Sequence, residues 1–468
     1  MTARVNLFFL FLPLCLAGQV LTKYTAPNTY LVERESIRTG EIDPYLSGRL
    51  SYEWGLALPA QSNDLLPSTM GDVWLRRDRL KIYPEITAVF YANGGRLAPR
   101  GPSVDVSPVI NVAARYASLL LGRFELMFWG RFEKHSVVRQ GNLSDLSYDL
   151  SWQKEVGRAS FPGKDSTWAE YDIGDGGILF SYPGGQITLA KANPIWGSGY
   201  TGNVWLSNKP PSFVFGSVRH RFSERWVFSI LHGTLNSGIR DSTHAGSLEV
   251  GNQRINFPLI RKYVAAHRLD FYPVPQARIS LGESVIYGGR GREPQYFVPL
   301  VMYWSAQHDL LDTDNLQWFL DGELIRRGTG RLYGTVYLDE WDLMDTFNKE
   351  ESRNWGAYQV GFTYNLPPFL PGESLLRMEL THMTPYVYVH ENKVNWFQHH
   401  GHYLGFWSGP NSDNLFVAVE GIVKRGYWLQ VYGQRTRRGE VSDETVAMQY
   451  TFQKIPFLYP NRDTPETR

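Results

Sequence analysis

Apolar and polar positions alternate with a period of two residues in many segments of the chain. In the segment 375–382, leucine, methionine and leucine share one face while arginine, glutamate and threonine share the other. The same alternation recurs at 317–324, 331–339 and 445–452. Because successive side chains of a β-strand point to opposite faces, this pattern predicts strands with one apolar and one polar face.

The length of these segments narrows the choice among all-β folds. They run to about ten residues, the length that crosses a hydrocarbon layer obliquely, whereas strands of soluble sheets are shorter. The sequence therefore predicts a transmembrane antiparallel β-barrel of roughly 16–18 strands, a size that encloses an aqueous lumen. An aromatic-rich secreted β-protein that binds or cleaves sugars is the alternative fold for the same pattern.

Composition agrees with a barrel. The mean hydropathy is -0.31, which a barrel tolerates because only alternate wall residues contact lipid. The chain holds 27 Tyr and 15 Trp, the residues that form aromatic girdles at membrane interfaces. The net charge of +1 argues against a nucleic-acid partner.

The chain begins with an apolar run from Val5 to Ala17 after a short basic start, so we expect residues 1–17 to be a secretory signal peptide. No linker divides the remainder, and we interpret 18–468 as a single outer-membrane barrel domain with long extracellular loops. Cys15 is the sole cysteine. The exported chain would contain no disulfides and would depend on a hydrogen-bonded framework.

The segment 193–213 is the most distinctive motif. It contains Gly-x-Gly-x-x-Gly at Gly197, Gly199 and Gly202, which in a nucleotide site must lead into a helix. Pro210 and Pro211 would end such a helix at once. We therefore expect a glycine-rich bend at the barrel wall, flanked by tryptophans at the lipid interface.

Catalytic chemistry has little support in the sequence. The chain has neither a Gly-x-Ser-x-Gly elbow nor a His-Glu-x-x-His motif. Glycoside cleavage needs a pair of carboxylates, and the sequence does not indicate which carboxylates on different strands would form such a pair. Four histidines lie between 390 and 402, but neither cysteines nor carboxylates at ligand spacing accompany them. We expect no catalytic residue, no metal and no cofactor.

Several motifs resemble a known family. They include Trp196-Gly197-x-Gly199 followed by Leu206-Ser207-Asn208, and Pro210-Pro211-x-Phe213. Further matches lie in order at 267–271, 281–289, 384–390 and 404–410. Between about Asp172 and Asp413 the chain resembles capsule assembly proteins of the Wzi type, which are outer-membrane barrels that bind capsular polysaccharide. The best-studied branch carries an amino-terminal helical plug, and no helical pattern marks such a plug here.

The resemblance implies that this chain binds and organises capsular or other surface polysaccharide at the cell outer membrane. Sugars are held by aromatic faces and planar polar groups. Long irregular stretches at 136–168, 237–256, 287–313 and 385–413 are the candidate binding loops. The candidate polysaccharide-binding residues on these loops are Arg290, Arg292, Trp396, His399 and His400.

Arg268 and Asp270 share one face of a predicted strand, and we expect them to join a charged network in the lumen. We expect a monomer whose partners are surface polysaccharide and outer-membrane lipid. An outer-membrane porin or polysaccharide-export channel is the alternative function, with the same charged residues lining a conducting lumen. A hydrolase or lipid-modifying enzyme of the outer membrane is a third hypothesis.

Overall fold

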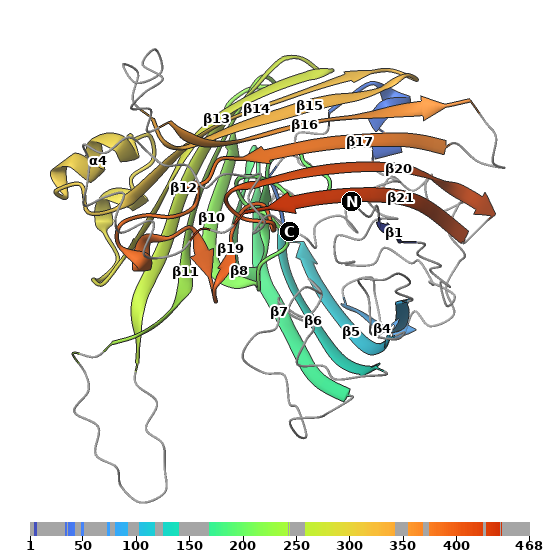
Figure 1. Ribbon diagram of the computed structural model, residues 1–468, viewed down its shortest axis with the longest axis horizontal. Coiled ribbons are helices and arrows are strands. Elements are labelled where there is room, and N and C mark those ends of the chain that lie inside the picture. The colour runs from blue at the N-terminus through green and yellow to red at the C-terminus, as the bar shows by residue number, and fades with distance from the viewer. Residues whose placement is uncertain are drawn as a thin grey trace, which may run out of the picture.

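The computed structural model of the chain (Figure 1) describes residues 4–6, 33–34, 36–42, 48–50, 73–74, 80–91, 103–117, 125–139, 168–241, 243, 258–341, 354–367, 374–424, 427–439 and 441. Three predicted segments fall wholly or mostly outside these ranges, namely the strand at 445–452 and the loops at 136–168 and 237–256. None of the described helices is long and apolar enough to cross a membrane.

One antiparallel sheet dominates the described residues and contains 17 strands. Its long strands are β4 (Leu80–Tyr91), β5 (Ser103–Ala117), β6 (Glu125–Arg139), β7 (Trp168–Tyr182), β8 (Gly185–Ala192), β10 (Phe213–Arg221), β11 (Trp226–Arg240), β12 (Leu259–Val274), β13 (Ala277–Gly288), β14 (Asn315–Arg326), β15 (Gly330–Glu340), β16 (Trp355–Leu366), β17 (Ser374–Met383), β20 (Ser412–Lys424) and β21 (Tyr427–Arg438). The short strands β1 (Arg4–Asn6) and β3 (Val73–Trp74) complete the sheet.

Most neighbours in this sheet are neighbours in the chain. The exceptions include β8 with β10, β17 with β20, and β1 with β21. The sheet curves round on itself in Figure 1, and all of its pairings with a defined register are antiparallel. The predicted all-β antiparallel barrel is confirmed. Strand β1 pairs with β21 and lies within the predicted signal peptide, so a cleaved chain would lack it.

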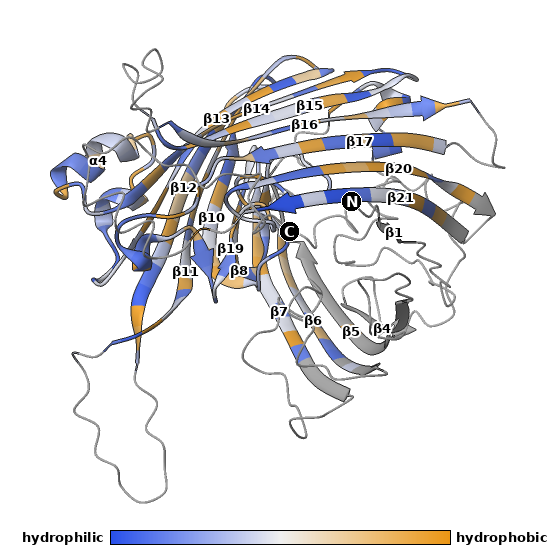
Figure 2. Ribbon diagram, viewed as in Figure 1, coloured by the Kyte–Doolittle hydropathy of each residue, from blue (hydrophilic) through white to orange (hydrophobic). Residues whose placement is uncertain are grey.

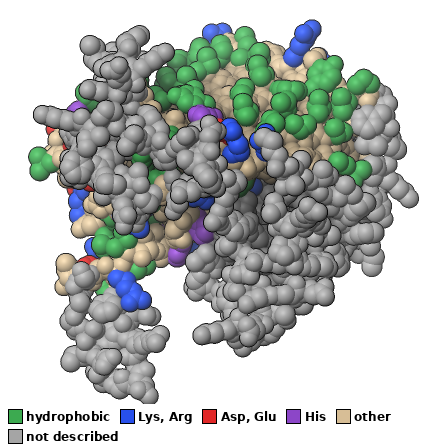
Figure 3. All heavy atoms as spheres, viewed as in Figure 1, with side chains coloured by type: hydrophobic (Ala, Val, Ile, Leu, Met, Phe, Trp, Pro, Cys, Tyr) green, Lys and Arg blue, Asp and Glu red, His purple; other side chains and the backbone are tan. Residues whose placement is uncertain are grey.

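Burial along the wall is the reverse of that in a soluble sheet. In β17, Arg377 and Glu379 are 0% exposed, whereas Leu380 is 46% exposed. Figure 2 shows hydrophilic and hydrophobic residues following one another along the wall strands, and Figure 3 shows the outward apolar side chains on one face of the molecule. Exposed apolar residues on the outer face of the wall, here called the lipid belt, include Ile187, Leu189, Val214, Leu269, Ile279, Leu281, Leu320, Leu324, Leu332, Val360, Met378 and Leu380.

The two ends of the barrel differ in the length of their connections. At one end, turns such as 183–184 and 327–329 join adjacent strands, and Gly184 and Gly328 adopt positive φ there, as tight turns require. At the other end, connections of fifteen residues or more join β11 to β12, β13 to β14 and β17 to β20. In outer-membrane barrels the long connections are extracellular.

Two of the loops expected to be irregular contain regular structure. The connection after β13 holds a 3-10 helix η4 (Pro294–Phe297) and a helix α4 (Tyr303–Asp309). The connection after β17 holds a 3-10 helix η5 (Lys393–Asn395) and a hairpin of β18 (Gln398–His399) and β19 (His402–Tyr403). These elements decide where the candidate binding residues lie.

Candidate functional site

Ion pairs connect adjacent strands across the inner face of β12–β15. The Arg268 Nε donates to Asp270 Oδ1 at 2.8 Å, and both residues are at most 1% exposed. Arg278 lies 3.7 Å from the same Asp270 oxygen and 2.6 Å from Asp321 Oδ1. A buried charge without a partner would cost several kcal/mol, so the pairing is what makes these residues compatible with the interior.

The network continues to a segment before the barrel, residues 33–42, here called the amino-terminal strap. Arg331 bridges Glu323 at 2.6 Å and Glu33 at 3.3 Å. Arg377 Nη2 lies 2.5 Å from Glu33 and 2.7 Å from Glu420. Burial alone would raise the pKa of the Glu33 carboxyl, but the charges of Arg377 and Arg331 hold it below its usual range. We define the interior network as this set of paired residues.

The strap corrects the expectation that the amino-terminal region lacks a helical plug. Residues 33–34 and 36–39 are helical, and Ile37 and Ile42 are buried. Ile42 N–H donates to Pro275 O, and Gly328 N–H donates to Ile37 O, both at 2.8 Å. The strap therefore covers the short-turn end beside β12–β15. These helical residues are too few to leave a recognisable 3.6-residue pattern in the sequence.

The strap should detach in acid. Because the folded-state pKa of Glu33 is depressed below 4.5, its contribution is present at neutral pH and is lost as pH falls through the folded value. A nitroxide on Glu41→Cys, with Cys15 replaced by serine, should become mobile only as the pH falls below the ordinary glutamate pKa of about 4.3, toward the lower pKa that Glu33 has in the folded protein. Glu33→Gln should give the mobile spectrum at pH 7. An immobilised label at both pH values in both proteins would contradict the proposal that the Glu33 ion pairs hold the strap.

The glycine-rich segment, residues 193–212, corrects another expectation. It leaves the wall after β8 and runs inside the barrel, so we call it the inner block. Its short strand β9 (Pro194–Trp196) pairs with β2 (Gly48–Leu50), and Trp196 and Trp205 are 3% and 0% exposed. The tryptophans therefore lie in the interior and not at the lipid interface.

Buried carboxylates of the wall hold the inner block. Ser198 donates from its hydroxyl and its amide to Asp321, at 2.8 and 3.2 Å. The Glu379 carboxylate accepts the backbone N–H groups of Tyr200 and Thr201, at 2.6 and 3.0 Å. Gly197 has φ +130 and a Cβ there would lie 2.8 Å from Asn203, which explains the glycine. The interior carboxylates thus have a structural task.

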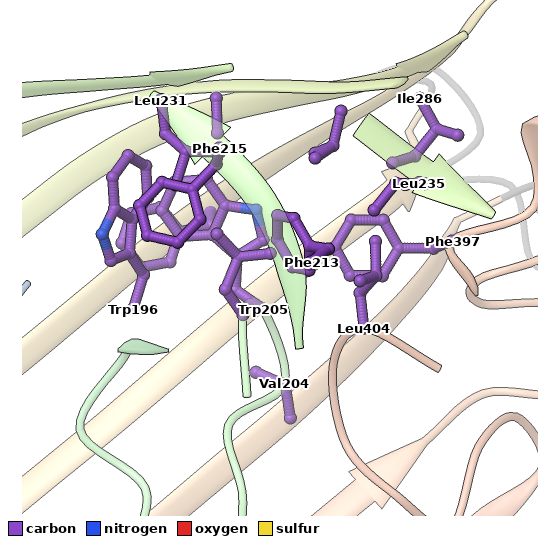
Figure 4. Packing of buried hydrophobic residues seen from close by; sticks show 14 of the residues in the cluster. Trp196, Val204, Trp205, Phe213, Phe215, Leu231, Leu235, Ile286, Phe397 and Leu404 are labelled. Carbon is purple, nitrogen blue, oxygen red and sulfur yellow. The ribbon is translucent and has the colours of Figure 1, made fainter. Parts of the chain in front are cut away.

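Aromatic packing fills the space above the inner block (Figure 4). The Trp205 ring stacks on Phe319 with centroids 4.0 Å apart, and its Nε1 donates to Ser284 at 2.8 Å. Phe397 and Leu404, from the connection after β17, belong to the same buried cluster and are 0% exposed. That connection therefore folds into the mouth of the barrel and packs on the inner block.

Two candidate polysaccharide-binding residues are buried, which corrects the expectation of exposed loop groups. Trp396 is 8% exposed and packs with Trp355 and Tyr386, and its Nε1 donates to His390 O at 2.7 Å. His399 is 4% exposed and its Nδ1 accepts the Asn236 N–H at 2.9 Å. Loop length does not report burial, because long connections can fold back onto the barrel.

Burial favours the neutral form of His390, His399 and His400. Burial lowers the pKa of His399 to about 3 and that of His390 to about 4. Burial and then Lys191 lower the pKa of the half-buried His400. Within the residues that the structure describes, no group of three or more His, Cys, Asp or Glu side chains is placed to hold a metal ion.

The two candidate arginines have different environments. Arg290 is half-buried and forms a two-armed pair with Asp314, at 2.8 and 2.6 Å, and this hydrogen bonding raises the arginine pKa. Arg292 is exposed and donates to Thr234 Oγ1 at 3.3 Å. Arg292 is therefore the more available of the two for a ligand.

The long-loop end carries a cationic and aromatic surface that we call the rim surface. Its cations lie over tyrosine and tryptophan rings: Arg290 over Tyr287 at 5.2 Å, Arg292 over Tyr263 at 5.7 Å and Lys393 over Trp396 at 5.3 Å. Exposed Arg261 adjoins them through its carbonyl, which accepts the Gly289 N–H at 2.9 Å. Arg261 and Lys393 are not among the residues predicted from the sequence, although Lys393 lies three residues before Trp396 on the same binding loop.

Comparison with known proteins places the fold. No protein-family model matches the chain, and no curated protein matches it by sequence. Among solved structures it is similar to Wzi from Escherichia coli, an outer-membrane protein involved in group 1 capsule assembly and described as a carbohydrate-binding β-barrel. The TM-score is 0.50 at 13% identity, over 92% of this chain and 87% of that chain. The chain has an outer-membrane β-barrel fold.

Mutants of the porin from Rhodopseudomonas blastica are also similar. One of them has a TM-score of 0.36 at 7% identity, over 76% of this chain and 99% of the porin.

Proposed function

We propose that this protein is a non-enzymatic outer-membrane barrel of the Wzi type that binds and organises surface polysaccharide and so attaches capsule. The observation that carries the proposal is the similarity to a carbohydrate-binding barrel over 92% of the chain. The ordered motifs between 196 and 410 support it independently, because they are features of the sequence and not of the fold.

The rim surface supports an acidic polysaccharide as the ligand. Aromatic rings pack against sugar rings, and guanidinium groups match carboxylates with two hydrogen bonds. Arg261, Arg292 and Lys393 are exposed there. The rim therefore presents exposed cations next to aromatic rings.

Removing two rim cations should weaken this binding. We expect Arg292→Ala with Lys393→Ala to lower the affinity for uronate-containing polysaccharide at least about tenfold, because a hydrogen bond to a charged group contributes about 1.5–3 kcal/mol. Binding of purified protein to a glycan array measures it, and polysaccharide shed into the medium measures retention on cells.

Arg225→Ala with Arg326→Ala is the matched control, since both arginines are exposed and lie at the short-turn end. It removes the same charge and should bind as the parent protein does. Equal binding by both double variants would contradict the rim as the binding surface. Sugar products of lower mass after incubation would instead favour the enzyme hypothesis.

Close packing in the described part of the interior argues against the porin or export-channel alternative. Side chains of the inner block and of the connection after β17 pack at 0–1% exposure, including Trp205, Phe397 and Phe406. Planar bilayers containing the purified protein should show no steady conductance of the porin type. A stable ohmic conductance of the parent protein would instead favour a transport function.

A further inference from the structure

The connection between β13 and β14, residues 289–314, packs on the outer face of the barrel wall, and we call it the outer-wall segment. The lipid belt shows where it begins. Leu269 and Leu281 pair across β12 and β13 and are 36% and 59% exposed. The next outward pair toward the long-loop end, His267 and Glu283, is 8% exposed at both positions. The belt therefore ends where this segment covers the wall.

The inner side of the segment makes close contacts with these outward positions. Trp304 N–H donates to Glu283 Oε2 at 3.1 Å, and the rings of Tyr303 and His267 lie 4.2 Å apart. Tyr296 and Ala306 are at most 1% exposed. They form one buried cluster with the outward residues Tyr263, Ala265, Val285 and Tyr287. The segment is thus fixed on the wall, and in Figure 1 α4 lies outside the strands.

Large apolar side chains gather on the outer side of the segment. The exposed fractions of these side chains are Phe297 46%, Val298 47%, Leu300 71%, Met302 54%, Trp304 50% and Leu311 84%. Exposed charged and polar groups, His308, Asp309 and Asp312, lie beside them at the end of α4. Leu300 and Leu311 have φ of +67 and +68, a left-handed conformation that non-glycine residues rarely adopt. At Leu311 this conformation closes the end of α4, where the Leu311 N–H donates to His308 O at 3.1 Å and the Asp312 N–H donates to Gln307 O at 3.0 Å, but the side chains of both leucines remain exposed. An apolar surrounding would stabilise them.

We propose that the outer side of the segment lies in the outer leaflet, at the boundary between acyl chains and headgroups. Its continuity with the lipid belt carries the assignment, because Glu283, which holds Trp304, is two residues from Leu281 on the same face of β13. Tryptophan prefers this boundary, and short apolar segments bind there with one face. The inference goes beyond polysaccharide binding: the segment fixes the depth and tilt of the barrel.

Nitroxide depth measurements test the proposal in the full chain. Leu300→Cys and Leu311→Cys, each with Cys15 replaced by serine, would be spin-labelled and reconstituted in phosphatidylcholine vesicles. Leu281→Cys in the lipid belt and Glu391→Cys, an exposed loop position, provide the lipid and water references. We expect the ratio of oxygen to nickel-chelate accessibility at both leucine positions to match Leu281→Cys.

Two results would overturn the proposal. Ratios equal to that of Glu391→Cys would place the segment in water. Low accessibility to both reagents, with dipolar broadening between labels, would show that a second copy of the chain covers it. Two independent leucine positions keep the test decisive if one variant fails to give the gel shift of a folded barrel.

Discussion

Replacing Arg377 by alanine should lower the free energy of unfolding by about 3–5 kcal/mol, because removing one partner of a buried ion pair leaves the other charge uncompensated. Arg377 is 0% exposed and lies 2.5 Å from Glu33 and 2.7 Å from Glu420. Its guanidinium also lies over the Tyr200 ring of the inner block, at 3.8 Å. One substitution therefore affects the wall, the strap and the inner block.

Urea titration of the detergent-solubilised protein, followed by tryptophan fluorescence, measures this change. Arg326→Ala is the matched control, since this exposed arginine should change stability by less than about 0.5 kcal/mol. The double variant Arg377→Ala with Glu33→Gln should lose less than the sum of the single variants, because the pair is coupled. Equal transition midpoints for Arg377→Ala and Arg326→Ala would contradict a stabilising network.

The wall of the barrel was predictable because its signal is local. A strand exposes alternate residues to lipid, so neighbouring positions such as Arg377 and Met378 identify the two faces by themselves. The structure places them at 0% and 37% exposure. Arg268 and Asp270 are brought together for the same reason, since a two-residue spacing on one strand is enough to place both on the inner face.

The inner block and the loops were not predictable because their contacts are distant in sequence. Tyr200 is held by Glu379, 179 residues away. A glycine-rich stretch with tryptophans can form either a bend in the wall or a segment inside the barrel, and its composition does not distinguish the two. Trp396 has the residue type of a sugar-binding group, but its burial depends on Trp355 and Tyr386. Residue type alone does not distinguish a binding face from a packed one.

The outer-wall segment did leave a signal in the sequence. His267 and Glu283 occupy outward positions next to Leu269 and Leu281, and polar groups facing lipid are costly. A polar pair within an otherwise apolar face therefore marks a place where protein covers the wall.

Arginine in place of Val336 should destabilise the barrel by about 2–4 kcal/mol, the cost of a cation near the bilayer midplane. Val336 lies near the middle of β15 and pairs with Leu320 and Tyr358, which are 45% and 44% exposed on the lipid belt. Folding into vesicles, followed by the gel shift between folded and unfolded forms over a urea series, measures the loss.

The control position has to face inward without being tightly packed. The sequence favours Thr335 as the tolerant neighbour, but Thr335 is 3% exposed and donates to Asp321 at 2.6 Å, so arginine there would disrupt the interior network. Gln434 on β21 is half-buried and donates to Asn414 at 2.7 Å. Gln434→Arg should cost less than Val336→Arg, because water and polar groups on the inner side solvate the cation. A larger loss of stability for Gln434→Arg than for Val336→Arg would mean that β15 does not present Val336 to lipid. It would contradict the assignment of the outer face.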